Sequence, residues 1–269
     1  MERKRLYLAG LVLIVIIALV LVFAGTGKGT PGAALVAFDN QPVPQSVLAD
    51  LHVPNSVATT VGVGLASNFP VHISGKPLTL NGKPEILYIG SEFCPYCAVE
   101  RWGLVIALMR FGNFTGLKYM TSSPTDVGPN TPTFTFIGAQ YTSNYISFVT
   151  RELVNNVVNA STGQYTTLQT LNTSLTALTT KYNPNGSIPF VDYANESTQV
   201  GANYNDPTIL ANMNWSTIAG MLQNSNSTQS LALIGSANVD TAQICKILNN
   251  TPSSVCGQGY IKSIESELG

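Results

Sequence analysis

Residues 85–112 read EILYIGSEFCPYCAVERWGLVIALMRFG, and this stretch decides the fold. Ile86–Ile89 is a short continuous apolar run that ends at Gly90, as a strand buried on both faces does. From Pro95 to Phe111, apolar residues recur at spacings of three and four, which predicts an amphipathic helix that Gly112 ends. The stretch is therefore typical of a strand, a turn that contains cysteines, and a helix.

The neighbouring segments extend this unit into an α/β domain. Leu117–Thr121 is the next predicted strand, and the crossover rule makes it parallel to the first. Residues 143–182 show helical spacing, so we expect a helical insertion there. A second apolar strand is expected at Ser187–Tyr193, with helices following at about 207–223 and 238–250.

The composition excludes several classes of protein. Of 269 residues, 45% are hydrophobic and only 10% are charged, which rules out a disordered polyelectrolyte. Thirteen basic against fourteen acidic residues leave no cationic field that could gather nucleic acid. The length instead suits one sizeable domain with an appendage.

The amino-terminal segment predicts a single-pass membrane anchor. An uncharged apolar run covers residues 6–24 after Arg3, Lys4 and Arg5, and as a helix it spans about 28 Å. The alternative is a cleaved signal peptide. In either case the basic residues stay in the cytoplasm, and the rest of the chain lies outside it. The expected organisation is a cytoplasmic tail (1–5), an anchor (6–24), a linker with an N-terminal extension (25–84) and an extracytoplasmic domain (85–269).

Acceptor sequences for N-glycosylation are frequent in this ectodomain. Glycosylation stays open as an expectation, because a chain rich in Asn and Thr produces such sequences by chance. The eight sites are Asn113, Asn159, Asn172, Asn185, Asn195, Asn214, Asn226 and Asn249.

The CxxC motif Cys94-Pro95-Tyr96-Cys97 carries the strongest chemical signal. It places the first sulfur over the unpaired N–H groups and the positive dipole end of the following helix, which favours a thiolate. The spacing lets the second thiol attack a mixed disulfide formed by the first. We therefore predict Cys94 as an exposed nucleophile and Cys97 as a buried resolving thiol.

A CxxC pair can also bind a metal or form a purely structural disulfide. A zinc or iron–sulfur site needs about four ligands, and besides this pair the chain offers only Cys245, Cys256, His52 and His72. Neither histidine belongs to a ligand cluster, so no metal is predicted. A purely structural disulfide between Cys94 and Cys97 remains the second interpretation.

Cys245 and Cys256 form the other pair, near the end of the chain. Outside the cytoplasm this spacing is most simply a structural disulfide that fixes the last helix. The alternative is a second redox pair that relays electrons from Cys94 and Cys97.

The order strand, CxxC, helix and strand, with Ile188-Pro189 opening a later strand, resembles the thioredoxin fold. The resemblance implies that Pro189 is cis and faces the active-site cysteines, while Ile188 offers its backbone to an extended substrate. Pro95-Tyr96 is the dipeptide found in glutaredoxins, so these four residues are the expected substrate contacts. The helical insertion is more like the periplasmic disulfide oxidoreductases.

One position departs from that pattern. Thioredoxins often carry a buried acid six residues before the first cysteine, where this chain has Tyr88. Glu100 and Arg101, one turn after Cys97, are candidates for the missing proton transfer. The simpler interpretation of these two is an exposed ion pair on the helix.

A narrower resemblance covers nearly the whole ectodomain. The string from Gly90 to Phe114, together with Thr131–Phe134, Ile188–Val191 and Thr241–Cys245, is similar to an uncharacterised archaeal and actinobacterial family. That family is catalogued as domain of unknown function 929. It supports the architecture and implies no activity.

The sequence thus predicts a thioredoxin-like α/β fold and a membrane-anchored, extracytoplasmic thiol–disulfide oxidoreductase acting on proteins. It needs no dissociable cofactor, because the disulfide carries two electrons. Its expected partners are client proteins with thiols or disulfides and a membrane redox partner that resets it. The alternative is a non-enzymatic binding or envelope-assembly module with structural disulfides.

Overall fold

A computed structural model describes residues 31–268, so the predicted anchor at 6–24 lies outside the described residues. Within 31–268, no helix is long and apolar enough to cross a membrane. The fold is mixed α/β, with a central mixed sheet. Its strands are β1 (Val71–His72), β2 (Thr79–Leu80), β3 (Lys83–Gly90), β8 (Ser147–Glu152), β11 (Phe190–Tyr193) and β12 (Ser197–Val200).

Strand β3 is the centre of this sheet. The hydrogen-bonded order is β1-β12-β11-β3-β2, and β8 also pairs with β3. β3 is antiparallel to β11 and parallel to β8, with Gly90 level with Glu152. This register places the carboxyl end of β8 beside the point where β3 ends and the cysteine turn begins.

The two faces of β3 enter two different apolar clusters. Ile86 and Tyr88 belong to the main core, whereas Leu87 and Ile89 belong to a smaller cluster on the other face. This alternation follows from the period of two in a strand. The continuous apolar run therefore predicted correctly a strand that is buried on both faces.

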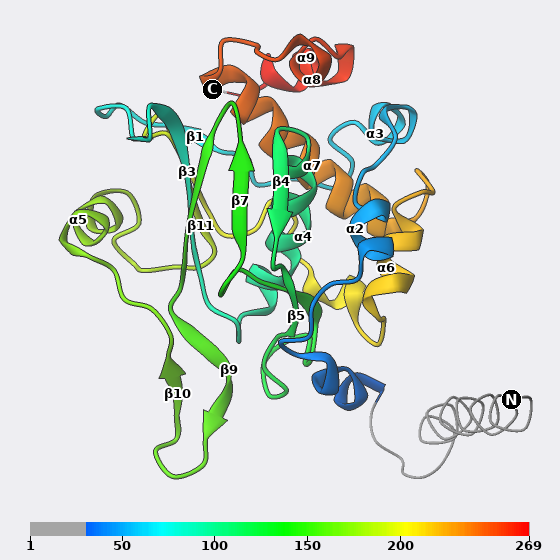
Figure 1. Ribbon diagram of the computed structural model, residues 1–269, viewed down its shortest axis with the longest axis vertical. Helices are drawn as coiled ribbons and strands as arrows, with labels where there is room; N and C mark the ends of the chain where they lie inside the picture. Colours follow the sequence, from blue (N-terminus) through cyan, green and yellow to red (C-terminus); the bar gives the residue numbers. More distant parts are fainter. Residues whose placement is uncertain (1–30, 269) are drawn as a thin grey trace, which may run out of the picture. The chain divides into compact units, whose positions relative to one another are not determined.

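Helices cover both faces. α4 (Pro95–Met109) packs against α7 (Thr228–Ile247) over the main core, as Figure 1 shows. The two helices approach closely at Gly103, where an added Cβ would lie 2.8 Å from the Cβ of Ser236. The short helix α5 (Thr173–Tyr182) contributes Leu175 to the smaller cluster on the opposite face.

Residues before β1 and after β12 complete the main core. Val47, Leu51, Ala58 and Val61 are buried in it, so the segment that was expected as an extension packs with the domain. The elements in these parts are η1 (Pro31–Phe38), α2 (Gln45–Asp50), α3 (Asn55–Val61), η2 (Pro207–Leu210), α6 (Trp215–Met221), α8 (Ser253–Cys256) and α9 (Gly259–Glu265).

The expected parallel partner of β3 was wrong. The strand after α4 was predicted to lie parallel to β3, but Lys118–Thr121 pairs antiparallel with a neighbour in a separate two-stranded sheet. The crossover rule applies only to strands of one sheet, and the crossover from β3 is completed later, at β8. The intervening strands are β4 (Gly112–Thr115), β5 (Lys118–Thr121), β6 (Pro132–Thr135) and β7 (Gln140–Ser143).

The expected helical insertion at 143–182 was also largely wrong. Only α5 is helical there; the remainder forms β8 and a two-stranded ribbon of β9 (Val154–Asn159) and β10 (Gln164–Thr167), which extends away from the sheet in Figure 1. Val and Thr are frequent in this segment and fit a strand better than a helix. Apolar spacing alone could not reveal this.

Candidate functional site

The CxxC motif lies where β3 ends and α4 begins. Cys94 is the N-cap of α4, with φ −76° and ψ 120°, and Pro95 is the first helical residue. The backbone N–H of Cys97 donates to Sγ of Cys94, with the two atoms 3.3 Å apart. Because α4 otherwise leaves its first N–H groups without partners, the sulfur takes the place of a conventional capping oxygen.

Both thiols are free and both are buried, although the sequence predicted burial only for Cys97. Cys97 is fully buried, as expected, but only 5% of Cys94 is exposed, so the prediction of an exposed nucleophile was wrong. The reason is the loop before β11, which lies against the turn. Sγ of Cys94 is 3.9 Å from the carbonyl oxygen of Ile188, to which it donates.

The other predicted substrate contacts lie around the same turn. The Ile188–Pro189 peptide bond is cis, as the resemblance implied. Pro95 and Pro189 are buried, whereas Tyr96 and Ile188 are partly exposed. The structure therefore brings Ile188 to Cys94, and Tyr96 lies between the two cysteines in the chain.

The two thiols have opposite electrostatic environments. The hydrogen bond from Cys97 is the largest of the effects that lower the pKa of Cys94, and the backbone N–H groups of Cys97 and Tyr96 and the charge of Arg101 add to it. Burial, above all, raises the pKa of Cys97. The pair therefore holds one acidic thiol beside one that keeps its proton, which is the division of roles that exchange chemistry requires.

A buried ion pair lies beneath the cysteine turn. Nε and Nη2 of Arg101 donate to the two oxygens of Glu152 over 2.9 and 2.6 Å, and both side chains are fully buried. Nη2 also donates to the carbonyl oxygen of Ser91, 2.8 Å away. The interpretation of Glu100 and Arg101 as an exposed ion pair was wrong, because Arg101 pairs with a strand 51 residues away.

Glu100 points to a different part of the core. Its carboxylate accepts from the backbone and side-chain N–H groups of Asn203, and these hydrogen bonds do not reach either thiol. Burial and the neighbouring Asp240 raise its pKa well above the ordinary value. The structure thus does not bring Glu100, the predicted proton-transfer residue, to the cysteines.

Sequence reasoning missed Glu152 and underrated Tyr88. The Tyr88 ring faces the guanidinium carbon of Arg101 at 5.7 Å, and its buried hydroxyl has no hydrogen-bond partner among residues 31–268. Glu152 carried no signal, because its place depends on the register between β3 and β8. Tyr88 did carry a signal, because it lies six residues before Cys94, where thioredoxins often have a buried acid.

The ribbon β9–β10 borders the site. The ring of Phe93, the residue before the first cysteine, stacks on Tyr165 of β10 with centroids 4.6 Å apart and planes 12° apart. The hydroxyl of Tyr165 donates to Ser123, whose backbone N–H donates to the carbonyl of Phe93. These contacts connect the cysteine turn to a segment more than sixty residues further along the chain.

Cys245 and Cys256 form a disulfide, as predicted. Their sulfurs are 1.99 Å apart, and both residues are fully buried in the main core. The bond joins the end of α7 to α8. The alternative role of this pair as an electron relay stays a prediction.

Two of the hollows in the described part of the chain lie at different distances from the cysteine turn. One of about 220 Å³ adjoins it and is lined by Ile89, Leu153, Leu171, Thr179, Thr180, Asn183, Pro184, Gly186 and Ile188.

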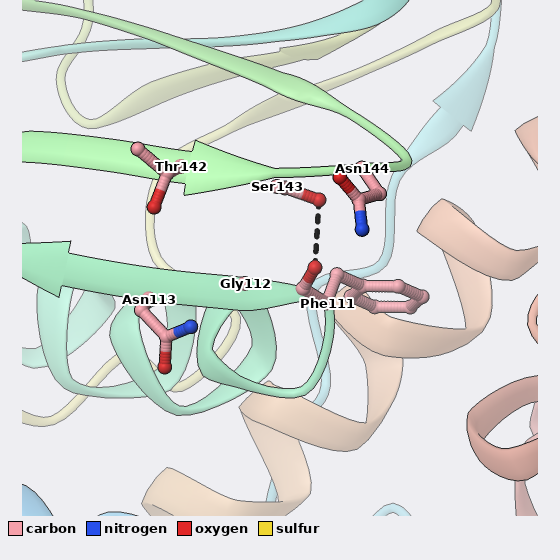
Figure 2. A pocket seen from close by; sticks show the side chains of 6 residues that line it. All are labelled: Phe111, Gly112, Asn113, Thr142, Ser143 and Asn144. Carbon is pink, nitrogen blue, oxygen red and sulfur yellow. Dashed lines mark hydrogen bonds between the residues drawn. The ribbon is translucent and has the colours of Figure 1, made fainter.

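The other hollow, of about 260 Å³, lies where β4 and β7 meet (Figure 2). There the hydroxyl of Ser143 donates to the carbonyl of Phe111 over 2.6 Å. The lining residues are Phe111, Gly112, Asn113, Thr142, Ser143 and Asn144, none of which is an acid, a base or a thiol. This hollow therefore offers no group of the kind that carries thiol or acid–base chemistry.

The fold and the site together define a mixed α/β protein with a pair of free CxxC thiols at a helix N-terminus and a separate buried disulfide. Residues 69–246 match the family model described as Domain of unknown function (DUF929), and the chain belongs to that family. No curated protein and no solved structure matches the chain. The family membership names no activity, so any function has to be argued from the site.

Proposed function

We propose that the protein is a thiol–disulfide oxidoreductase that acts on the thiols and disulfides of other proteins through Cys94 and Cys97. One observation carries the proposal: Sγ of Cys94 caps α4 and accepts the N–H of Cys97 at 3.3 Å. A sulfur in that position is stabilised as a thiolate, while Cys97, fully buried, keeps its proton until it is needed.

The proposed fold behind this chemistry is thioredoxin-like. It is supported by the sheet order β8, β3, β11, β12, in which the CxxC follows the central strand β3 and leads into α4. The contact between Ile188 and Cys94 adds support, because it places backbone groups before β11 next to the sulfur. An extended client segment would bind along those groups.

In the reducing direction, the Cys94 thiolate attacks one sulfur of a client disulfide. A mixed disulfide forms and the other client sulfur leaves with the electron pair and takes up a proton. Cys97 then loses its proton and attacks Sγ of Cys94, so that the Cys94–Cys97 bond forms and the second client thiol is released. Two electrons have passed from the pair to the client, and a second protein must return them. The oxidising direction is the reverse of these steps.

The burial of Cys94 places a condition on this reaction. Phe93, Tyr96 and Ile188 around it are partly exposed, so their side chains can be displaced without opening the core. We expect the reaction with a client to depend on that displacement. Small thiol reagents should reach Cys94 more slowly than they reach a cysteine in an unfolded peptide.

The proposed location is the outer side of a cell membrane, with residues 6–24 as the anchor and a membrane redox partner nearby. The basic residues before that segment and the disulfide Cys245–Cys256 support this placement, because disulfides persist in oxidising compartments. Labelling of intact cells with a membrane-impermeant amine reagent tests it, because Lys76 and Lys181 are exposed whereas both free thiols are buried. Labelling of the full chain only after lysis would contradict it.

Single substitutions in the full chain test the activity. Cys94→Ser should abolish insulin reduction and oxidative refolding, because no attacking sulfur remains. Cys97→Ser should instead accumulate mixed disulfides with clients, since the resolving thiol is gone. Cys245→Ser with Cys256→Ser is the matched control and should keep the activity.

Full activity of folded Cys94→Ser would overturn the proposal. An inactive parent, combined with loss of folding when the pair is replaced, would favour the alternative of a non-enzymatic module in which the CxxC is a structural element.

A further inference from the structure

Arg101 is placed directly behind the resolving thiol. It lies four residues after Cys97 in α4, so both side chains project from the same face of the helix. Two of its three nitrogens are occupied, by Glu152 and by the carbonyl of Ser91. The third, Nη1, is buried and has no hydrogen-bond partner within the described part of the chain.

The guanidinium and the cysteine turn share one carbonyl group. The oxygen of Ser91 accepts from Nη2 of Arg101 at 2.8 Å and from the backbone N–H of Cys94 at 3.3 Å. A backbone hydrogen bond from Ser91 also lowers the pKa of Cys97. Arg101 is therefore joined to both cysteines through a single backbone unit, and Glu152 holds it there.

Of the charged groups around the pair, Arg101 is the one that can stabilise a negative charge on a cysteine sulfur. The other titratable groups described near the site are Tyr88 on β3, Glu92 in the turn, Tyr96 in the motif, Glu152 on β8 and Tyr165 on β10, and none of them is a cation. The loop before β11 offers the uncharged Ile188. Within residues 31–268, the cation whose charge lowers the pKa of Cys97 is Arg101, and it lies in a water-poor interior where charge interactions are strong.

We propose that Arg101, held in place by Glu152, is a positioning residue that stabilises the negative charge on Sγ of Cys97 when this sulfur attacks the mixed disulfide. The proposal rests on the function proposed above. In that step the proton of Cys97 leaves for solvent, the Cys94–Cys97 bond forms, and the bond from Cys94 to the client breaks. The client sulfur departs with the electron pair and is then protonated.

The arrangement also explains why a tyrosine at position 88 is compatible with the site. A carboxylate there would compete with Glu152 for Arg101 and repel both thiolates. The Tyr88 ring instead offers its face to the guanidinium and adds no charge. Beneath the pair, Arg101 thus supplies a positive charge that is held by the buried acid Glu152, and position 88 adds none.

The first test measures the Cys97 thiol alone, in the Cys94→Ser background, by following thiolate ultraviolet absorbance against pH. Arg101→Met removes the cation but leaves Glu152 buried without a partner. The double variant Arg101→Met with Glu152→Gln removes both charges and is therefore the variant on which the test depends. We expect the pKa of Cys97 to rise by about one unit, a tenfold change in the ionisation equilibrium.

The second test measures the resolving step itself, as the release of a thiol from a preformed mixed disulfide on Cys94. The double variant should release it about tenfold more slowly at neutral pH, with the pH–rate profile moved to higher pH. Arg101→Lys should recover part of the rate, because it restores the charge without the paired geometry. Arg110→Gln, at the other end of α4, is the matched control and should change neither measurement.

An unchanged Cys97 titration in the folded double variant overturns the role of Arg101, whatever the activity of the parent. The failure of the proposed function has a different signature. In that case the parent shows no exchange with any client, while the titration still responds to Arg101.

Discussion

The two cysteine pairs of this protein occupy contrasting environments. Cys94 and Cys97 lie at a strand–helix junction, beside backbone N–H groups and a buried arginine, and are free. Cys245 and Cys256 lie among apolar side chains of the main core and are joined. The residue type is the same, so the chemistry of each pair is decided by the local backbone and by nearby charge.

The largest expected difference between the pairs is their response to mild reductant. Once oxidised, the Cys94–Cys97 bond should be reduced in a glutathione buffer that leaves Cys245–Cys256 intact, because the second bond is fully buried among the apolar side chains of the main core and does not cap a helix N-terminus. We expect reduction equilibria that differ by at least about a hundredfold, or about 60 mV. Trapping of free thiols followed by mass spectrometry measures this. Joint reduction of both pairs would remove the contrast and favour an electron relay.

The second difference concerns stability. Replacing Cys245 and Cys256 by serine should lower the free energy of unfolding by about 3 kcal/mol, since the unfolded chain regains the entropy of an open loop. Denaturant unfolding measures the change. Replacing Cys94 and Cys97 in the reduced protein removes no cross-link and is the control; an equal loss there would mean that the thiol pair is also structural.

The third difference concerns proton binding by buried acids. Whereas Cys94 favours ionisation, the disulfide-bearing helix α7 carries a buried acid, because burial raises the pKa of Asp240 to about 7. Burial likewise raises the pKa of Asp192 to about 7 and that of Asp39 to about 6. The folded state keeps these protons while the unfolded chain releases them above about pH 4. Stability should therefore be greatest on the acid side and fall as the pH rises from about 4 to about 7.

Asp240→Asn is the variant that tests this pH dependence. It preserves the oxygen that accepts from Tyr193 and Asn203 but has no proton to lose, so the slope of stability against pH should become shallower. Thermal unfolding across the pH range measures it. Stability that rises with pH in this range would show that the buried acids are not protonated in the folded protein.

The smallest expected effect is that of Tyr88→Phe beside the thiol pair. Among the described residues the buried hydroxyl of Tyr88 has no hydrogen-bond partner, so its removal should raise the free energy of unfolding by about 1 kcal/mol. The ring, and with it the contact to Arg101, stays. A loss of stability would mean that the hydroxyl has a partner in solution, such as a bound water.

Local patterns located the cysteine turn well. The run before Gly90, the spacing in α4 and the Cys-x-x-Cys motif are contiguous in the chain, so strand, helix and thiol pair could be predicted together. The pairing of Arg101 with Glu152 could not, because it depends on a register between strands about sixty residues apart in the chain. The ribbon β9–β10 was missed for a related reason: valines at helical spacing also fit a strand.

The burial of Cys94 also could not be predicted from local sequence. Its place at a helix N-terminus was evident from the chain, whereas the loop that covers it comes from residues before β11. Helix position decides how readily a sulfur ionises, but segments remote in sequence decide whether a reagent reaches it.

Because Phe93 stacks on Tyr165, the surface beside Cys94 is formed in part by a segment that does not set the acidity of its thiol. The ribbon that carries Tyr165 contacts the residue before Cys94, and neither of its strands, β9 and β10, carries a charged side chain. Under the proposed function, a longer or shorter turn between β9 and β10 would alter which client segments fit, and the acidity of the thiol would remain as it is. Selectivity and reactivity would then depend on different segments of this chain.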